Sequence, residues 1–88
     1  MVLKQKYIRT SDDTIIVFPE LHQHKDFKHF NPVSAGFISF STKKVEHSGQ
    51  YYHETDCVCY GESVSLDLKS NEEEDTFLAK KQILGHLI

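Results

Sequence analysis

Clusters of turn-forming residues divide most of the chain into short segments that are rich in β-branched and aromatic side chains. The clusters are Ser11–Asp13, Asn31–Pro32, Ser48–Gly49 and Gly61–Glu62. Gly, Pro, Asn, Asp and Ser favour tight turns, so each cluster predicts a reversal of the chain. Most of the segments between them have the length of strands rather than of helices. The sequence therefore predicts an antiparallel sheet whose strands are joined mainly by hairpins.

Two strands are predicted at the beginning of the chain. Residues 2–9 (VLKQKYIR) are expected to form an edge strand whose lysines face water. Thr14–Phe18 (TIIVF) lacks the alternation of a half-buried strand, so we expect it to be buried on both faces or central in the sheet. The two strands would pair as a hairpin. Pro19 then suits the first turn of a helix, and we expect a short helix over residues 20–29.

Strand-like segments continue through the middle of the chain. Val33–Ser41 and Tyr51–Tyr60 are expected to be strands, with a short strand or loop over Lys43–Gln50 between them. Gly36 indicates a bulge or a close approach of the backbone. Gly61–Glu62 suits a two-residue hairpin loop. In the alternating segment that follows, the side chains expected in the core are Val64, Leu66 and Leu68, and those expected in water are Ser63, Ser65 and Asp67.

The C-terminal segment predicts a helix over residues 71–84. Ser70 and Glu73 have the spacing of a capping box, and Gly85 suits the residue after a helix end. Acidic residues in the first turn and lysines near the other end complement the helix dipole. The predicted fold class is α+β: a small antiparallel sheet of roughly four or five strands, with the C-terminal helix packed on one face and a short helix after the second strand.

The length of the chain limits how deep an active site can be. With 88 residues, we expect one domain over residues 1–88. A chain of this size buries roughly 60–65% of its unfolded surface, which is enough for one thin core. A deep site that excludes water is hard to build on such a core. We therefore expect a protein that is not an enzyme.

Charge and hydropathy indicate the setting of the protein. The net charge is −3, so the chain lacks the basic footprint of a nucleic-acid-binding protein. No apolar run reaches the roughly 18 residues of a membrane span. The first ten residues lack the apolar segment of a signal peptide. We therefore expect a cytoplasmic protein with no membrane or nucleic-acid partner and with reduced cysteines.

Histidine is unusually frequent in this chain. There are six histidines, and His22, His24 and His29 lie close together around Asp26. Imidazole binds zinc or copper, and a carboxylate can join or orient such a site. On a helix, however, His22 and His24 would point about 200° apart, which disfavours chelation of one ion. Ordinary surface or half-buried histidines explain the segment better.

Two cysteines, Cys57 and Cys59, lie within a predicted strand. Residues two apart in a strand have Cα atoms about 6.5–7 Å apart, which is at the limit of disulfide geometry. We expect both to act as small core hydrophobes. The alternatives are a metal site and a redox or nucleophilic thiol, although nothing in the sequence forces a histidine close to either sulfur. The residues of the metal alternative, with zinc as the candidate ion, are His22, His24, His29, Cys57 and Cys59.

Two motifs resemble those of a known group of short proteins. One runs from Phe18-Pro19-Glu20 to the NPVSAGF segment that ends at Phe37, and the other is CYGESVSLDLKS over residues 59–70. Together they resemble short hypothetical proteins of bacteriophages, prophages and their hosts, and the likeness covers about half of the chain. Lys43–Asp56 is longer than the corresponding stretch of that pattern. The resemblance implies a phage accessory role and implies no catalytic residue, because the group has no assigned activity.

The leading hypothesis from the sequence is a non-enzymatic module that docks on a protein partner, such as a host or defence component. Aromatic residues beside histidines are typical of interface hot spots. The candidate contacts are His22, His24, Asp26, Phe27, His29, Phe30, Tyr51 and Tyr52. Alternatives are the metal or small-ligand binder and a self-assembling structural protein. An edge strand would let the latter dimerise by strand pairing.

Overall fold

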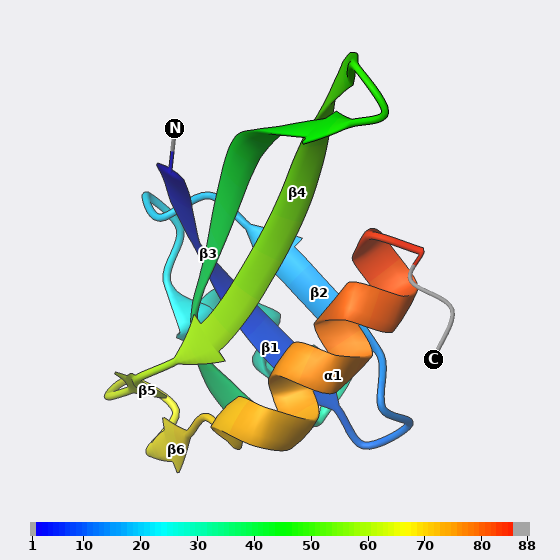
Figure 1. Cartoon of the computed structure of the whole chain (residues 1–88). Helices are drawn as coiled ribbons and strands as arrows, with labels where there is room; N and C mark the ends of the chain where they lie inside the picture. Colours follow the sequence, from blue (N-terminus) through cyan, green and yellow to red (C-terminus); the bar gives the residue numbers. More distant parts are fainter. Residues whose placement is uncertain (1, 86–88) are drawn as a thin grey trace.

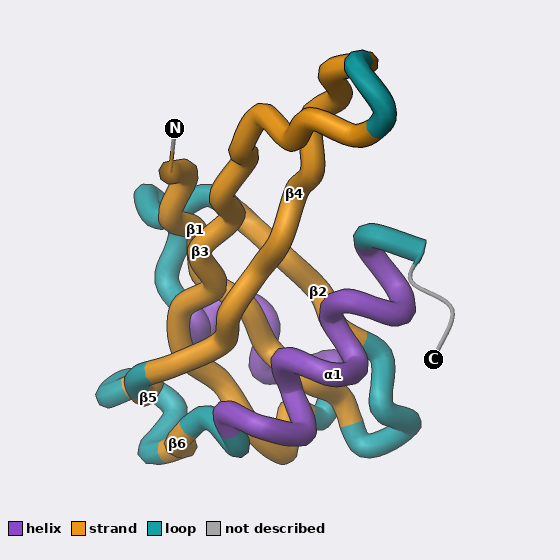
Figure 2. Tube along the Cα trace, viewed as in Figure 1, coloured by secondary structure: helices purple, strands orange, loops and turns teal. Residues whose placement is uncertain are grey.

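A computed structural model describes residues 2–85 of the chain. These residues form a four-stranded antiparallel sheet, a separate two-stranded ribbon, one α-helix and one short 3₁₀ helix (Figures 1 and 2). The elements in chain order are β1 (Val2–Thr10), β2 (Ile15–Phe18), η1 (His24–Phe30), β3 (Pro32–His47), β4 (Gln50–Tyr60), β5 (Glu62–Ser63), β6 (Leu68–Lys69) and α1 (Glu72–Ile83). The α+β class, the antiparallel sheet and the C-terminal helix are confirmed.

The order of the strands in the sheet is β2-β1-β3-β4. The predicted hairpin of β1 and β2 is present, and β2 is buried on both faces, with Ile15 in one core and Phe18 in the other. The expected places of the strands in the sheet, β1 at an edge and β2 in the centre, were wrong. β1 is central and β2, with four residues, is an edge. The reason is visible at Tyr7 and Ile8, which are neighbours on opposite faces of β1 and are both fully buried. Lys4 indicated an edge because β2 pairs only with Lys6–Arg9 of β1, so the first residues of β1 pair with β3 alone among the described strands.

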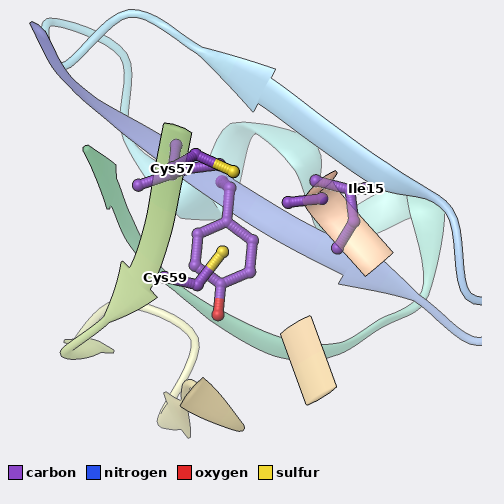
Figure 3. Close-up of a cluster of buried hydrophobic side chains, with 6 residues drawn as sticks. Ile15, Cys57 and Cys59 are labelled. Carbon is purple, nitrogen blue, oxygen red and sulfur yellow. The ribbon is translucent and has the colours of Figure 1, made fainter. Parts of the chain in front are cut away.

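The sheet carries a core on each face. On one face, α1 covers Tyr7, Ile15, Ile38, Cys57 and Cys59, and Figure 3 shows Ile15 and the two cysteines in this cluster. On the other face, η1 and the 61–70 segment cover a smaller cluster. The buried members of that cluster are Ile8, Phe18 and Ala35, and the partly buried ones are Ile16, Phe27, Leu66 and Leu68. The domain is therefore built of a sheet between a helix and a layer of irregular chain.

The helix after the second strand is a 3₁₀ helix that begins at His24, later than predicted. The chain first makes a turn after Pro19, in which the His22 amide donates to the Pro19 carbonyl at 3.1 Å. The helix ends at Phe30, because Asn31 after it has a φ of 56° and so leaves the right-handed region. The prediction of a helix over residues 20–29 was therefore wrong for residues 20–23, which lie in and just after that turn.

The alternating segment after Gly61 does not pair with β4 as predicted. β5 and β6 pair with each other instead, and residues 64–67 form the turn between them. The burial of two side chains is the reverse of the prediction: Ser63 is 2% exposed, whereas Val64 is 88% exposed. The Leu66 amide donates to the Ser63 hydroxyl at 3.3 Å, so this serine supports a turn rather than facing water. Leu66 is half-buried on the second core, as expected.

Helix α1 begins one residue later than the predicted capping box implied. Asn71 is the N-cap, and its side chain accepts a hydrogen bond from the Glu74 amide at 3.4 Å. Ser70 instead donates its amide to the Gly61 carbonyl at 3.0 Å. Gly85, with a φ of 69°, follows the helix end as predicted. Within residues 2–85, no helix is long and apolar enough to cross a membrane.

The β3–β4 hairpin extends beyond the rest of the sheet. The last partner of β1 on β3 is Ser41, so residues 42–55 pair only with each other. We call residues 42–55 the arm, and it projects from the body of the protein in Figure 1. Ser48 and Gly49, with φ of 53° and 77°, make the turn predicted at its tip. The arm contributes to the elongated shape of the chain, whose principal extents are 48 × 26 × 17 Å.

Candidate functional site

The outer edge of β4 in the arm carries main-chain groups that point away from β3. Because the loop at the tip has two residues, His47 and Gln50 form the hydrogen-bonded pair that closes the hairpin. Every second residue of β4 then directs its amide and carbonyl toward β3. The residues in between, Tyr51, His53 and Thr55, direct theirs outward. We call this row of three residues the open edge.

Two hydrogen bonds nearer the body of the protein confirm this alternation. Cys57 and Cys59 continue the outward row, and their amides do point away from β3. The Cys57 amide donates to the Asp56 side chain and the Cys59 amide donates to Thr76 of α1, both at 2.9 Å. Side chains therefore satisfy the outward amides where β4 passes α1. Among the described residues, no partner is seen for the amides of the open edge.

The open edge also lacks the features that protect edge strands from pairing. Short length, charged side chains (lysine above all) and proline are usual protections. The other sheet edge, β2, has four residues and is followed by Pro19. The β3 side of the arm carries Lys43 and Lys44. β4 contains neither lysine nor proline along its 11 residues, and its two acidic residues, Glu54 and Asp56, belong to the row that faces β3 rather than to the open edge. The start of β1, which β2 does not reach, carries Lys4. Of the sheet edges in the described chain, the open edge is thus the one best suited to accept another strand.

Tyr51 and Tyr52, both predicted as partner contacts, lie on the arm and are 62% and 50% exposed. As neighbours in a strand, they project from opposite faces of the hairpin. The Lys44 ammonium lies 4.4 Å from the centre of the Tyr51 ring, while Tyr52 stands opposite Val45 in the register. Each face of the arm therefore offers one large aromatic surface to a partner.

The other predicted partner contacts lie in or beside η1, and the structure divides them between core and surface. His24 is 5% exposed, and its Nε2 donates to the Gly36 carbonyl at 2.8 Å. Burial lowers the pKa of His24, against the raising effect of that hydrogen bond, so the ring is neutral at pH 7. Phe27 stacks on Phe18 with 4.0 Å between ring centres. His24 and Phe27 are therefore parts of the fold rather than a free binding surface.

The remaining residues of this segment are exposed. Asp26 accepts a hydrogen bond from the Gln23 amide at 3.2 Å and so stabilises the start of η1. His22 contacts Phe27 edge-on, with ring centres 6.5 Å apart. His29 lies against Phe30, which is 42% exposed. These side chains form a small aromatic surface, but they belong to a different element from the open edge.

The residues of the metal alternative do not come together. Cys57 and Cys59 lie in the core under α1, whereas His24 packs on Phe18 on the opposite face of the sheet. Within residues 2–85, no group of three or more His, Cys, Asp or Glu side chains is placed to hold a metal ion. Burial raises the pKa of Cys57 and raises that of Cys59 to about 12, so both thiols stay protonated at neutral pH. Both cysteines therefore serve as core side chains, as expected.

A buried carboxylate that the sequence analysis did not single out joins α1 to the sheet. Asp75 is fully buried, and its Oδ2 accepts hydrogen bonds from the Tyr7 hydroxyl at 2.5 Å, the Ser34 hydroxyl at 2.7 Å and the Asn71 amide at 3.1 Å. Its Oδ1 pairs with the Arg9 guanidinium at 2.9 Å. We call these residues the Asp75 cluster. With all these partners and no access to solvent, its role is to hold the fold together.

The sequence contained one signal for this cluster. Asp75 stands four positions before the buried Ala79, so the two share a helix face. The sequence analysis attributed Asp75, like the other acidic residues of the first helical turn, to the helix dipole alone. The donors on β1 and β3 could not be assigned, because their pairing with α1 depends on the tertiary arrangement.

The chain was also compared with known proteins. No family model, no curated protein and no solved structure matches it.

Proposed function

We propose that this protein is a non-enzymatic interaction module that binds an extended segment of a protein partner by strand addition at the open edge. The observation that carries the proposal is the row of outward amides and carbonyls at Tyr51, His53 and Thr55. It stands beside Cys57 and Cys59, whose outward amides are already satisfied. Strand addition of this kind is a common mode of peptide recognition.

The open edge supplies enough interactions for specific binding. Three residues with one donor and one acceptor each allow up to six main-chain hydrogen bonds, worth about 0.5–1.5 kcal/mol apiece. Tyr51 and Tyr52 add aromatic surface on the two faces of the arm, and tyrosine is enriched at binding hot spots. The partner segment therefore extends along β4 and alternates its side chains between these two tyrosines.

The position of the open edge also supports the proposal. An isolated two-stranded hairpin is only marginally stable in water, so a third strand would stabilise the arm. The resemblance to short phage and prophage proteins agrees with a small module that acts on a host or defence protein. The exposed aromatic surface at Phe30 is then a secondary contact rather than the main site.

The proposal is tested by blocking one outward amide without changing the β3–β4 ladder. His53→Pro removes the central donor of the open edge, and a strand edge tolerates proline at such a position. His53→Thr is the matched control, because it removes the same side chain but keeps the amide. Peptides selected from a random display library against the intact protein are then titrated into all three proteins. Amide hydrogen exchange at residues 51, 53 and 55 is followed by NMR.

We expect the selected peptides to slow exchange at these three amides and to bind the threonine variant. Their affinity for the proline variant should fall about two- to twelvefold, the loss of roughly one hydrogen bond. Equal binding to the proline variant, with its hairpin shown to be intact by NMR, would refute strand addition.

A second copy of the chain is the other candidate partner, for one specific reason. A two-fold axis through His53 would place Tyr51 opposite Thr55 of the second copy and Tyr52 opposite Glu54, so no like-charged acidic or basic pair would face across the junction. Light scattering over a concentration series tests this form. A monomer that persists up to about 1 mM would exclude it, since a dimer this weak contributes little at working concentrations.

A further inference from the structure

A groove of about 630 Å³ opens on the face of the sheet opposite α1. It lies between the chain around His24 and the segment that follows Tyr60, away from the tip of the arm. Its volume is within the usual range for sites that bind small molecules. Neither the open edge nor the Asp75 cluster contributes a residue to it.

Aromatic rings line the groove. Phe37 and Tyr60 are directly opposite each other on β3 and β4, with ring centres 6.0 Å apart and planes inclined by 30°. The Tyr60 hydroxyl and the Ser39 hydroxyl share a hydrogen bond of 3.0 Å, which fixes the tyrosine ring. A Cβ on Gly61 would lie 3.1 Å from Cδ2 of Phe37, so the glycine leaves this ring uncovered. Both rings are half-buried, and the part of their π surface that stays open can accept another planar ring.

Two ammonium groups lie at the same groove. Lys4 and Lys6 project from the same face of β1, with Cα atoms about 6.5–7 Å apart. The Lys4 ammonium is 4.4 Å from the centre of the Phe37 ring, and the Lys6 ammonium donates to the His22 carbonyl at 2.8 Å. Within the described chain, neither has a carboxylate within 4 Å. An ammonium carries three donors, so both lysines keep donors for a bound anion.

We propose that this groove binds an aromatic phosphate of mononucleotide size, with the phosphate on Lys4 and Lys6 and the planar base against Phe37 and Tyr60. Lysine is a common phosphate ligand, and aromatic side chains are the usual stacking platform for bases. The Glu62 carboxylate at the rim suits the donor groups of the ligand, such as ribose hydroxyls or an exocyclic amine, and repels a second anion. This favours a monophosphate over a polyphosphate or a nucleic-acid strand.

His24 does not add charge to the site. Its Nε2 proton is held by the Gly36 carbonyl, and the neutral ring stands edge-on to Phe37 with centres 6.0 Å apart. The positive charge that faces the ligand therefore comes from the two lysines. Binding should weaken as salt screens that charge.

The test is a titration of the full-length protein with AMP at pH 7, read from the NMR shifts of residues 37 and 60–65. Adenosine and inorganic phosphate are titrated separately as the two halves of the ligand. We expect saturable shifts with a Kd of about 1 mM or lower for AMP and weaker binding of each half, because the two contacts act together. No saturable shift up to about 10 mM AMP, or equal affinity for either half alone, would overturn the proposal.

Substitutions then assign the phosphate contact. Lys4→Gln and Lys6→Gln should each weaken AMP binding about five- to tenfold, the effect of one partly exposed charge-assisted hydrogen bond. Lys44→Gln is the matched control, because Lys44 lies at the same 4.4 Å from an aromatic ring but on the arm. Equal weakening by Lys44→Gln, or unchanged binding in both groove variants, would show that the lysines of the groove do not hold the phosphate.

Discussion

Replacing Asp75 by asparagine changes the charge and the hydrogen bonding of the Asp75 cluster while keeping its shape. The amide oxygen can still accept from Tyr7 and Ser34 at the Oδ2 position. The amide nitrogen then takes the Oδ1 position, which in the unsubstituted protein lies 2.9 Å from the Arg9 guanidinium. Both groups are hydrogen-bond donors, so they cannot bond to each other. One strong interaction is lost, and the bonds that remain become neutral.

The magnitude follows from these contacts. A hydrogen bond to a charged group contributes about 1.5–3 kcal/mol, roughly twice as much as a neutral one. Arg9 keeps the nearby carboxylates of Asp13 and Glu74, at 3.2 and 3.3 Å, which reduces the cost of its lost partner. We therefore expect Asp75→Asn to lower the free energy of unfolding by about 3 kcal/mol, the lower end of the effect of breaking a buried ion pair. For a domain of this size, the melting temperature should fall by roughly 12–24 °C.

The assay is urea unfolding of the intact protein followed by circular dichroism. Glu74→Gln is the matched control, because it makes the same chemical change one residue away on a side chain that is 53% exposed. That variant should lose less than about 1 kcal/mol, as is usual for an exposed ion pair. If Asp75→Asn lies within about 1 kcal/mol of the unsubstituted protein, the Asp75 cluster does not hold the fold in the way described.

Three further results are expected. Gly36→Ala should destabilise the protein by about 2 kcal/mol or more in the same urea assay, because its Cβ would clash with the Tyr60 carbonyl, and an unchanged midpoint would contradict that close approach. Cys57 and Cys59 should react with iodoacetamide at pH 8 far more slowly in the folded protein than in urea, since burial raises the pKa of both thiols. Equal rates, measured by mass spectrometry, would show that the two thiols are accessible. Burial, and then the hydrogen bond to Asp75, raises the pKa of Tyr7 well above its ordinary value of 10.0, so the unfolded chain loses this proton first as pH rises. Stability should therefore fall above about pH 10, and Tyr7→Phe should make that fall less steep; an identical slope in the variant would rule out Tyr7 as its source.

The sequence predicted the local features of the fold better than their arrangement. The hairpin turn at Ser48–Gly49 and the stop at Gly85 were predictable, because they depend on the backbone preferences of a few adjacent residues. The positions of β1 and β2 in the sheet were not, because they depend on which faces are covered by η1 and α1. Close approach at Gly36 was also predicted, and the nearby Tyr60 carbonyl explains it.

The candidate site shows the same division. Tyr51 and Tyr52 were singled out as aromatic residues on a strand, and both are exposed on the arm. The orientation of the main chain at His53 could not be derived until the register of the hairpin was known. His24 was misjudged as a partner contact, since no local pattern distinguishes a histidine that binds a carbonyl across the sheet from one that faces water.

The hydrogen bond between Tyr7 and Asp75 joins residues 68 positions apart in the chain. Contacts of such long range form against a large loss of chain entropy, and they slow folding relative to local pairing. The β1–β2 and β3–β4 hairpins can form from neighbouring segments. Helix α1, by contrast, can pack on the sheet only after the C-terminal part of the chain has come close to β1. We therefore expect docking of α1 to be a late step, so that Asp75→Asn speeds unfolding in a chevron measurement more than it slows refolding. The hydrogen bonds of Asp75 would then slow unfolding and so lengthen the lifetime of the folded state.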